Sequence, residues 1–516
     1  MAKSFSFGKI DLVASSEAAP GPAKPEPETL FRIAVLGDFS GRANHGLLET
    51  GTKLSARTPV LIDRDNFDEV MARLDVRLRL PVAGDGNAPV VLQFKELEDF
   101  HPDQIFTHTA LFQALKETRR RLINPKSFDA AAAELRVQAA PEPAPVPDPQ
   151  PAAAALSVNN EDLLSQILGE PIPVRSAAEE REVNPWGALV KEIVAPYAVA
   201  KASPRQGEIV ASVDETTSRL MRKILHHPEL QSLEAAWRGL FFLVRRLETD
   251  AKLSVSLIDV SKEELAADLT ATDDPSATGL YKLLVDPTVN TPGGKPWALL
   301  VLDATFAPND SDAGTLGRLA TIARFAGAPV LAGASPRAVE CTSFAETPDP
   351  DDWNDSLPSE DRESWNALRR LGDASFLGLA LPRFLLRLPY GKKDTPTESF
   401  AFEELTADSP HDDYLWGNPA FALAELLGRS FREFGWGLRP GRIDEISGLP
   451  VHVRRVDGDA EATPCAEAIL SHRAAERIQE RGLIPVLSVQ NQDAIRAGGF
   501  TSVAEPARPL SGRWRS

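Results

Sequence analysis

Short apolar runs bounded by polar turns recur along the chain, and the run Leu377–Leu381 (LGLAL) is the clearest of them. It is apolar at every position, as is typical of a strand that is buried on both faces of a sheet. Pro382 follows, and because proline has no amide hydrogen to donate, the run cannot continue as a central strand. Arg383 and Arg387 come next. Their guanidinium groups must either reach solvent from a buried stem or meet carboxylates on another element.

Elsewhere the pattern alternates between strands and helices. Early in the chain an apolar strand that begins at Leu30 is followed by a helix after Asn66, a strand at residues 89–95 and a further helix. Later, the apolar runs 253–260 and 296–306 are typical of buried strands, and amphipathic helices separate them. This alternation predicts an α/β fold of mixed sheets with flanking helices.

Proline and alanine mark the main division of the chain. Residues 137–156 mix prolines with small residues, which disfavours both helix and sheet and predicts a semi-rigid spacer. We therefore divide the chain into an N-terminal strand and tether, a first block, the spacer, a connector with a short amphipathic helix, and a second block, at residues 1–29, 30–136, 137–156, 157–183 and 184–516.

The N-terminal segment has the alternation of a strand. Phe5 and Phe7 fall on one face, and after Gly8 the alternation resumes with Ile10 and Leu12. The nearby sequence offers no obvious partner strand. We therefore expect this strand either to pair elsewhere, including with another molecule, or to be a frayed terminus.

The connector contains a short amphipathic helix pattern. Leu163, Leu164, Ile167 and Leu168 recur at i, i+1, i+4 and i+5, and Pro171 ends the pattern. There is little nearby core for this face to bury against, which favours a docking peptide for a partner's groove. The alternative is a helix that folds back onto its own domain.

Composition narrows the class of protein. Acidic residues outnumber basic ones by 74 to 56, and the formal charge of −18 argues against nucleic acid or an anionic membrane as the main partner. The two cysteines, Cys341 and Cys465, lack the spacing of a zinc or redox site. We find neither a secretory signal nor ~18 consecutive apolar residues, so we expect a cytoplasmic protein without membrane insertion. The basic C-terminal residues are expected to be flexible.

Three short motifs could carry chemistry, and each lacks a required part. The turn 37–42 (GDFSGR) lacks the lysine of a phosphate-binding loop. The sequence LAGASPR places Arg337 where a nucleophile elbow needs its second glycine. His226 and His227 are adjacent rather than in the H-E-x-x-H order of a zinc site. We therefore predict no catalytic, cofactor-binding or metal-binding residues, and this favours a structural or interaction role.

Several of these motifs carry a resemblance to a known family. The second block resembles the large subunit of the type VI secretion contractile sheath in ILHHPELQSLEAAWRGL, TGLYKLLV, PVLAGASP, FLGLALPRFLLRLPYG, DYLWGN and GLPVH, which occur in this order. The first block resembles the small sheath subunit in VLGDFSGR, IDRDNFDEVMARL and LQFKELEDFHPDQI. The resemblance covers residues 30–135 and 157–505, and it places both subunits in one chain.

The resemblance implies a structural protomer without chemistry of its own. Copies of such a protomer form helical rings around an inner tube protein, and the sheath contracts from a baseplate to propel the tube. Neighbouring protomers are linked by exchanged strands, which gives the segment Phe5–Val13 a candidate mate. In this family an AAA+ ATPase disassembles the contracted sheath by gripping a short helix near the start of the large subunit. Residues 162–168 lie at the corresponding position in this chain.

The same resemblance places Arg383, Arg387 and Trp416 in a structural motif. We expect the two arginines to meet carboxylates within the protomer or at its neighbour, and the two blocks to pack as one unit. Two other hypotheses remain open, namely a non-contracting adaptor or baseplate relative and, less favoured, a phosphate-binding enzyme that uses the turn 37–42.

Overall fold

The computed structural model describes most of both blocks, namely residues 4–7, 10–13, 25–82, 89–124, 126–136, 206–456 and 459–514. The predicted spacer 137–156 lies outside the described residues. The connector 157–183, with the helix pattern at residues 162–168, lies outside them as well.

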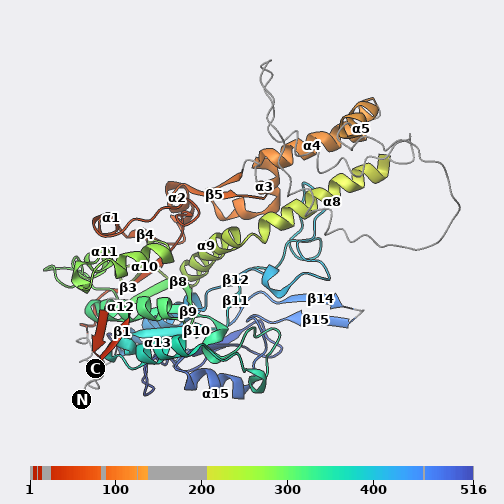
Figure 1. The fold of residues 1–516 in the computed structure, drawn as a ribbon. Helices are drawn as coiled ribbons and strands as arrows, with labels where there is room; N and C mark the ends of the chain where they lie inside the picture. The colour runs from red at the N-terminus through yellow and green to blue at the C-terminus, as the bar shows by residue number, and fades with distance from the viewer. Residues whose placement is uncertain are drawn as a thin grey trace.

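A nine-stranded mixed sheet forms the centre of the molecule (Figure 1). Its strands follow the spatial order β13 (Glu445–Ile446), β17 (Ile495–Ala497), β16 (Ile484–Ser488), β10 (Leu377–Leu381), β9 (Val330–Ala334), β8 (Leu299–Phe306), β3 (Phe31–Gly37), β7 (Leu253–Asp259) and β4 (Val60–Ile62). The strands from β16 to β7 run parallel, whereas β17 and β4 are antiparallel to their neighbours. The predicted α/β class with mixed sheets is confirmed.

The first block supplies a central strand of this sheet. In β3, Val35 is paired with Leu257 of β7 on one side and with Val301 of β8 on the other. The edge strand β4 also comes from the first block and pairs with β7. The two blocks therefore share one sheet, and the prediction that they pack as one unit is confirmed.

Helices cover both faces of the sheet, so the parallel strands are mostly apolar, without the strict alternation of a half-exposed strand. Alternate residues of β3 show the two layers, because Ile33 and Val35 belong to one core cluster and Ala34 and Leu36 to the other. The first layer contains α9 (Pro228–Arg246) and α14 (Pro419–Phe434), whereas α8 (Gln206–Leu225), which precedes α9, packs mainly against a helix of the first block. The second contains α10 (Lys262–Thr270), α11 (Gly279–Leu284), α12 (Asp310–Ala326), α13 (Ser359–Arg369) and α15 (His472–Glu480).

The rest of the first block forms a smaller α/β unit beside α8 and α9. It contains α2 (Phe67–Arg73), the hairpin of β5 (Val76–Leu80) and β6 (Val90–Phe94), α3 (Pro102–His108), α4 (Ala110–Ile123) and α5 (Phe128–Arg136), whereas α1 (Thr52–Ser55) packs against α11. Each hairpin strand alternates buried and exposed residues, as a strand with one covered face requires. Short 3₁₀ turns connect elements at Leu97–Phe100, Pro275–Ala277, Pro336–Val339, Pro350–Asp352, Gly372–Phe376, His411–Asp413 and Gly435–Gly437.

The N-terminal segment differs from the single strand without a local mate that we expected. It forms two strands, β1 (Ser4–Phe7) and β2 (Ile10–Val13), which pair antiparallel with Phe5 opposite Leu12. The alternation is the same for one strand and for a hairpin with a short turn, so only the position of Gly8 could have indicated the turn.

The C-terminal residues also differ from expectation, because they pack instead of being flexible. The Val503 amide donates to the Leu377 carbonyl at 3.0 Å, and the Ser511 amide donates to the Ser375 carbonyl at 2.8 Å. Leu510 is 1% exposed. Burial of the apolar residues between the basic ones holds this segment against β10. The basic composition alone had indicated a flexible tail.

Two further antiparallel strand pairs lie outside the large sheet. One pairs β14 (His452–Val456) with β15 (Asp459–Thr463). The other pairs β11 (Phe384–Leu385) with β12 (Trp416–Gly417), so that Leu385 lies opposite Trp416. The pair of β11 and β12 matters most here, because it carries the segment that follows Pro382.

Candidate functional site

The segment after β10 carries a cluster of buried charges. All of β10 is buried, as the sequence predicted. Beyond Pro382 the chain forms β11, and the arginines on either side of it turn toward carboxylates from distant parts of the same chain. The predicted contacts of Arg383 and Arg387 with carboxylates are therefore confirmed.

Arg387 is enclosed between two glutamates. Its Nε lies 2.7 Å from Glu234 Oε1 of α9, and its Nη1 lies 2.8 Å from Glu404 Oε2. The side chains of Arg387, Glu234 and Glu404 are 9%, 0% and 2% exposed. Burial opposes ionisation of Glu234, but the positive charges of Arg387 and Arg238 outweigh it and lower the pKa of this carboxyl.

Arg238 and Tyr390 complete this cluster. Arg238 Nε donates to Glu234 Oε1 at 2.6 Å, and its Nη2 donates to the Tyr390 hydroxyl at 3.0 Å. The Arg387 guanidinium lies over the Tyr390 ring, 4.1 Å from its centre. Burial raises the pKa of Tyr390 to about 12, so the phenol stays neutral. Two arginines thus balance two glutamates, and the cluster is neutral as a whole.

Arg383 lies nearer the surface than Arg387. Arg383 Nε donates to Glu467 Oε1 at 2.8 Å, and its Nη2 donates to Asp412 Oδ1 at 2.8 Å. Its side chain is 41% exposed. Trp416 is buried, and its indole nitrogen donates to the His411 carbonyl at 3.0 Å. These contacts fix the pair of β11 and β12 against the segment that precedes β12.

Sequence reasoning missed the carboxylate partners. Glu234 could have been noticed, because it lies between Leu233 and Trp237 on the apolar stripe of α9, where an acidic residue needs a buried cation. Glu404 and Asp412 lie in loops, and no local pattern marks a loop carboxylate as the partner of a distant arginine.

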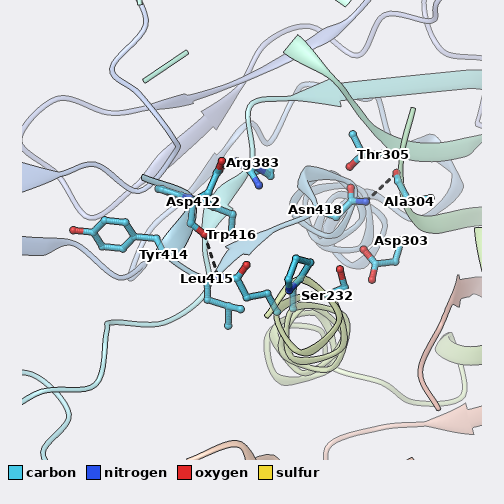
Figure 2. A pocket seen from close by; sticks show the side chains of 13 residues that line it. Ser232, Asp303, Ala304, Thr305, Arg383, Asp412, Tyr414, Leu415, Trp416 and Asn418 are labelled. Carbon is cyan, nitrogen blue, oxygen red and sulfur yellow. Dashed lines mark hydrogen bonds and ion pairs between the residues drawn. The ribbon is translucent and has the colours of Figure 1, made fainter. Parts of the chain in front are cut away.

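A cavity of about 380 Å³ opens beside the pair of β11 and β12. Figure 2 shows Asp303, Thr305 and Asn418 on one side and Arg383, Asp412, Tyr414 and Trp416 on the other. Asp303 belongs to β8 and lies near the carboxyl end of the parallel strands, where α/β folds bind ligands. Burial and the charge of Asp38 together outweigh a hydrogen bond from Asn418 and raise the pKa of Asp303 to about 7.

The turn 37–42 is occupied by contacts within the protein. The amides of Phe39 and Ser40 donate to Asp259 Oδ1 at 2.8 and 3.1 Å, and Ser40 Oγ donates to Asp259 Oδ2 at 2.7 Å. Further along, Arg42 and Arg57 hold the buried carboxylate of Glu264 at 2.8 and 2.7 Å. The backbone donors that a phosphate would need already bind a carboxylate, which disfavours a phosphate site in this turn.

The other candidate motifs have local structural partners. Ser335 Oγ accepts the Arg337 amide at the start of a 3₁₀ turn. His227 Nδ1 accepts the Glu229 amide and caps α9, whereas His226 Nδ1 lies 3.2 Å from Asp413 Oδ2. Within the described ranges, no group of three or more His, Cys, Asp or Glu side chains could hold a metal ion. Among the same residues, no helix is long and apolar enough to cross a membrane.

Comparison with known proteins places the chain in a family. Residues 207–504 match the VipB family, described as EvpB/VC_A0108, tail sheath N-terminal domain. Residues 16–138 match the VipA family, described as Type VI secretion system, VipA, VC_A0107 or Hcp2. The first match spans more than half of the chain, so the protein belongs to the VipB tail sheath family. The predicted fusion of small- and large-subunit segments in one chain is thereby confirmed.

One curated relative gives the degree of similarity. The chain is 34% identical over 307 residues to the type VI secretion system sheath protein TssC1 of Pseudomonas aeruginosa. The alignment covers 58% of this chain and spans 61% of that relative's length.

Proposed function

We propose that this protein is the repeating protomer of a type VI secretion sheath that assembles around an inner tube protein and contracts to propel it. The observation that carries the proposal is the shared sheet. The strand β3 of the VipA-like segment lies between β7 and β8 of the VipB-like segment, so one chain forms one complete unit with both subunits in a fixed one-to-one ratio.

Internal rigidity supports a mechanical role. The sheet is continuous across both segments, and buried ion pairs tie the segment after β10 to α9. A unit that must transmit force between its neighbours benefits from such cross-links. A buried ion pair is favourable in only one arrangement, because any other arrangement leaves a charge buried without its partner. The proposed role needs no catalytic step, cofactor, nucleic acid or membrane insertion, and the protein acts in the cytoplasm.

The proposed partners follow from the resemblance to sheath subunits. Further copies of the chain form the tube, and residues 4–13 link neighbours by strand pairing through Phe5, Phe7, Ile10 and Leu12. The inner tube protein and the baseplate provide the template for assembly. A AAA+ ATPase recycles the contracted sheath by gripping Leu163, Leu164, Ile167 and Leu168.

Electron microscopy of the purified full chain, alone and with its inner tube and baseplate proteins, tests the proposal. We expect tubes or stacked rings in negative stain. Chains that stay monomeric with every partner present would contradict a sheath role. A variant that lacks residues 1–13 should fail to form tubes, and intact assembly of this variant would instead favour a non-contracting adaptor.

A further inference from the structure

A groove of about 370 Å³ lies at the end of the molecule that is formed by α3, α4 and α8. Phe106, Leu115 and Phe400 make its apolar part, and Phe400 stacks on Phe106 with 4.7 Å between ring centres. Ile123, the last residue of α4, lines the same groove with 46% of its surface exposed. A large apolar side chain exposed beside an apolar groove favours a bound partner.

The chain leaves and re-enters the described residues beside this groove. The helix α5 packs against α4 and ends at Arg136. The chain re-enters at Gln206, whose side-chain amide donates to the carbonyls of Leu122 and Ile123 at 2.7 and 3.0 Å. Figure 1 shows α4, α5 and the start of α8 together at one end of the molecule. Residues 137–205 therefore begin and end close to the groove.

The rim of the groove is basic. Lys116, Arg119 and Arg120 line it from α4. Arg119 pairs with Asp214, and Arg120 pairs with Glu117 in a highly exposed ion pair that contributes little. Lys116 is exposed, and its Nζ lies 6.0 Å from the centre of the Phe106 ring. An occupant with an apolar face and acidic flanks would suit this lining.

We propose that residues 161–170 of the same chain occupy this groove. The apolar residues of this segment, Leu163, Leu164, Ile167 and Leu168, match the apolar wall. Glu161, Asp162 and Glu170 flank them and match the basic rim. The inference goes beyond the proposed function, because intramolecular docking occurs whether or not copies of the chain assemble.

Chain length permits and favours this contact. The stretch from Arg136 to Glu161 can extend to roughly 80 Å, and the stretch from Glu170 to Gln206 can extend further still. Because both ends are anchored near the groove, the effective concentration of the segment is on the order of millimolar. A weak helix-in-groove contact is then largely occupied, and any other protein that binds the same leucines must first displace it.

A labelled peptide of residues 159–171 tests the inference by fluorescence anisotropy. We compare the intact chain with a variant in which Gly and Ser replace residues 161–170, so that its groove is open. The peptide should bind the open variant at least roughly tenfold more tightly than the intact chain. Equal binding to both, or binding to neither, would overturn the inference.

Surface substitutions locate the binding site. In the open variant, Ile123→Asp should abolish peptide binding, and Lys116→Glu should weaken it and be rescued by a peptide with Asp162→Lys. The matched control is Val91→Asp on β6, because Val91 is 56% exposed and does not line this groove. If Ile123→Asp and Val91→Asp affect binding equally, the peptide binds elsewhere and the inference fails.

Hydrogen exchange of the intact chain separates docking in cis from docking between copies. Amides of residues 161–170 should exchange more slowly in the intact chain than in its Ile123→Asp variant. This difference should persist on dilution to concentrations at which light scattering shows monomers. Protection that disappears on dilution would show that a second copy supplies the segment, and this would contradict docking within one chain.

Discussion

Arg387 and Glu234 form an ion pair of 2.7 Å although 153 positions separate them in the chain. The pair joins the segment after β10 to α9 inside the core, and Glu404 closes it from the other side. Removing one partner from such a cluster leaves the remaining charges buried without compensation, which costs far more than the intact pair contributes.

We therefore predict that Arg387→Leu lowers the free energy of unfolding by about 3–5 kcal/mol. Urea unfolding of the full chain, followed by far-ultraviolet circular dichroism, measures the change. Arg120→Leu is the matched control, because Arg120 is 77% exposed and forms an exposed ion pair with Glu117, three positions earlier in α4. Its loss should cost less than about 0.5 kcal/mol. Equal costs for the two variants would show that burial of Arg387 is not the source of its contribution.

The raised pKa of Asp303 predicts a stability that depends on pH. The folded-state pKa of about 7 exceeds the ordinary value of 3.8, so between these values the folded protein keeps a proton that the unfolded chain loses. Stability should fall as the pH rises from about 4 to 7 and then level off. Asp303→Asn removes this penalty and should stabilise the protein at pH 8, by at most roughly 4 kcal/mol.

Thermal unfolding of the Asp303→Asn variant across pH 4–8 checks this behaviour. The gain over the wild type should shrink as the pH approaches 4. Asp65→Asn serves as the control, because the Asp65 side chain is 90% exposed, and the substitution should leave the pH profile unchanged. A gain that is independent of pH would refute the assignment to the Asp303 proton.

Glu264 should have the opposite pH dependence. Burial opposes its ionisation, but hydrogen bonds from Arg42 and Arg57 outweigh this and lower its pKa to about 2. The ionised Glu264 carboxylate contributes its full stabilisation of the folded state above the ordinary pKa of 4.5. This stabilisation is lost as the pH falls toward 2. Glu264→Gln should therefore destabilise the protein at pH 7 by up to roughly 3 kcal/mol, and the difference should narrow between pH 5 and 3. Urea midpoints at pH 7, 5 and 3 measure it, and a constant difference would argue against an ionic role.

Gly239 on α9 allows α14 to approach closely. A Cβ atom at this position would lie 2.5 Å from the Phe421 ring, which is fully buried. Gly239→Ala should destabilise the protein by about 1–3 kcal/mol even though alanine favours helix. Gly314→Ala on α12 is the control, because a Cβ atom added at this position would have no other atom within 4 Å. This substitution should raise the free energy of unfolding by about 0.5–1 kcal/mol. The two variants should shift the urea midpoint in opposite directions, and a shared direction would contradict the packing argument.

Local pattern predicted the elements of this fold better than their arrangement. The strand Leu377–Leu381 was predictable because burial on both faces leaves a continuous apolar run. The position of β3 between β7 and β8 was not predictable. The pattern of apolar residues indicates that a strand is buried, but it does not identify the neighbouring strands. The resemblance to sheath subunits supplied the expectation that the blocks pack together.

The candidate site shows the same limit. Arg383 and Arg387 stood out because cations among leucines need partners, and those partners could be anticipated as carboxylates. Which carboxylates they are depends on tertiary structure, and Glu404 reaches Arg387 from a loop that has no periodic pattern. The hairpin of residues 4–13 was missed for a related reason, since one extended strand and two paired ones alternate identically.

The central position of β3 has a consequence for synthesis of the chain. The Phe39 amide at the end of β3 bonds to an Asp259 carboxylate that lies 220 positions later. A ribosome that adds residues at ordinary rates needs roughly 10–45 s to cover that distance. During this time the nascent first block has an apolar strand with both edges open, and this strand stays exposed to pairing with other chains until its own second block emerges to enclose it.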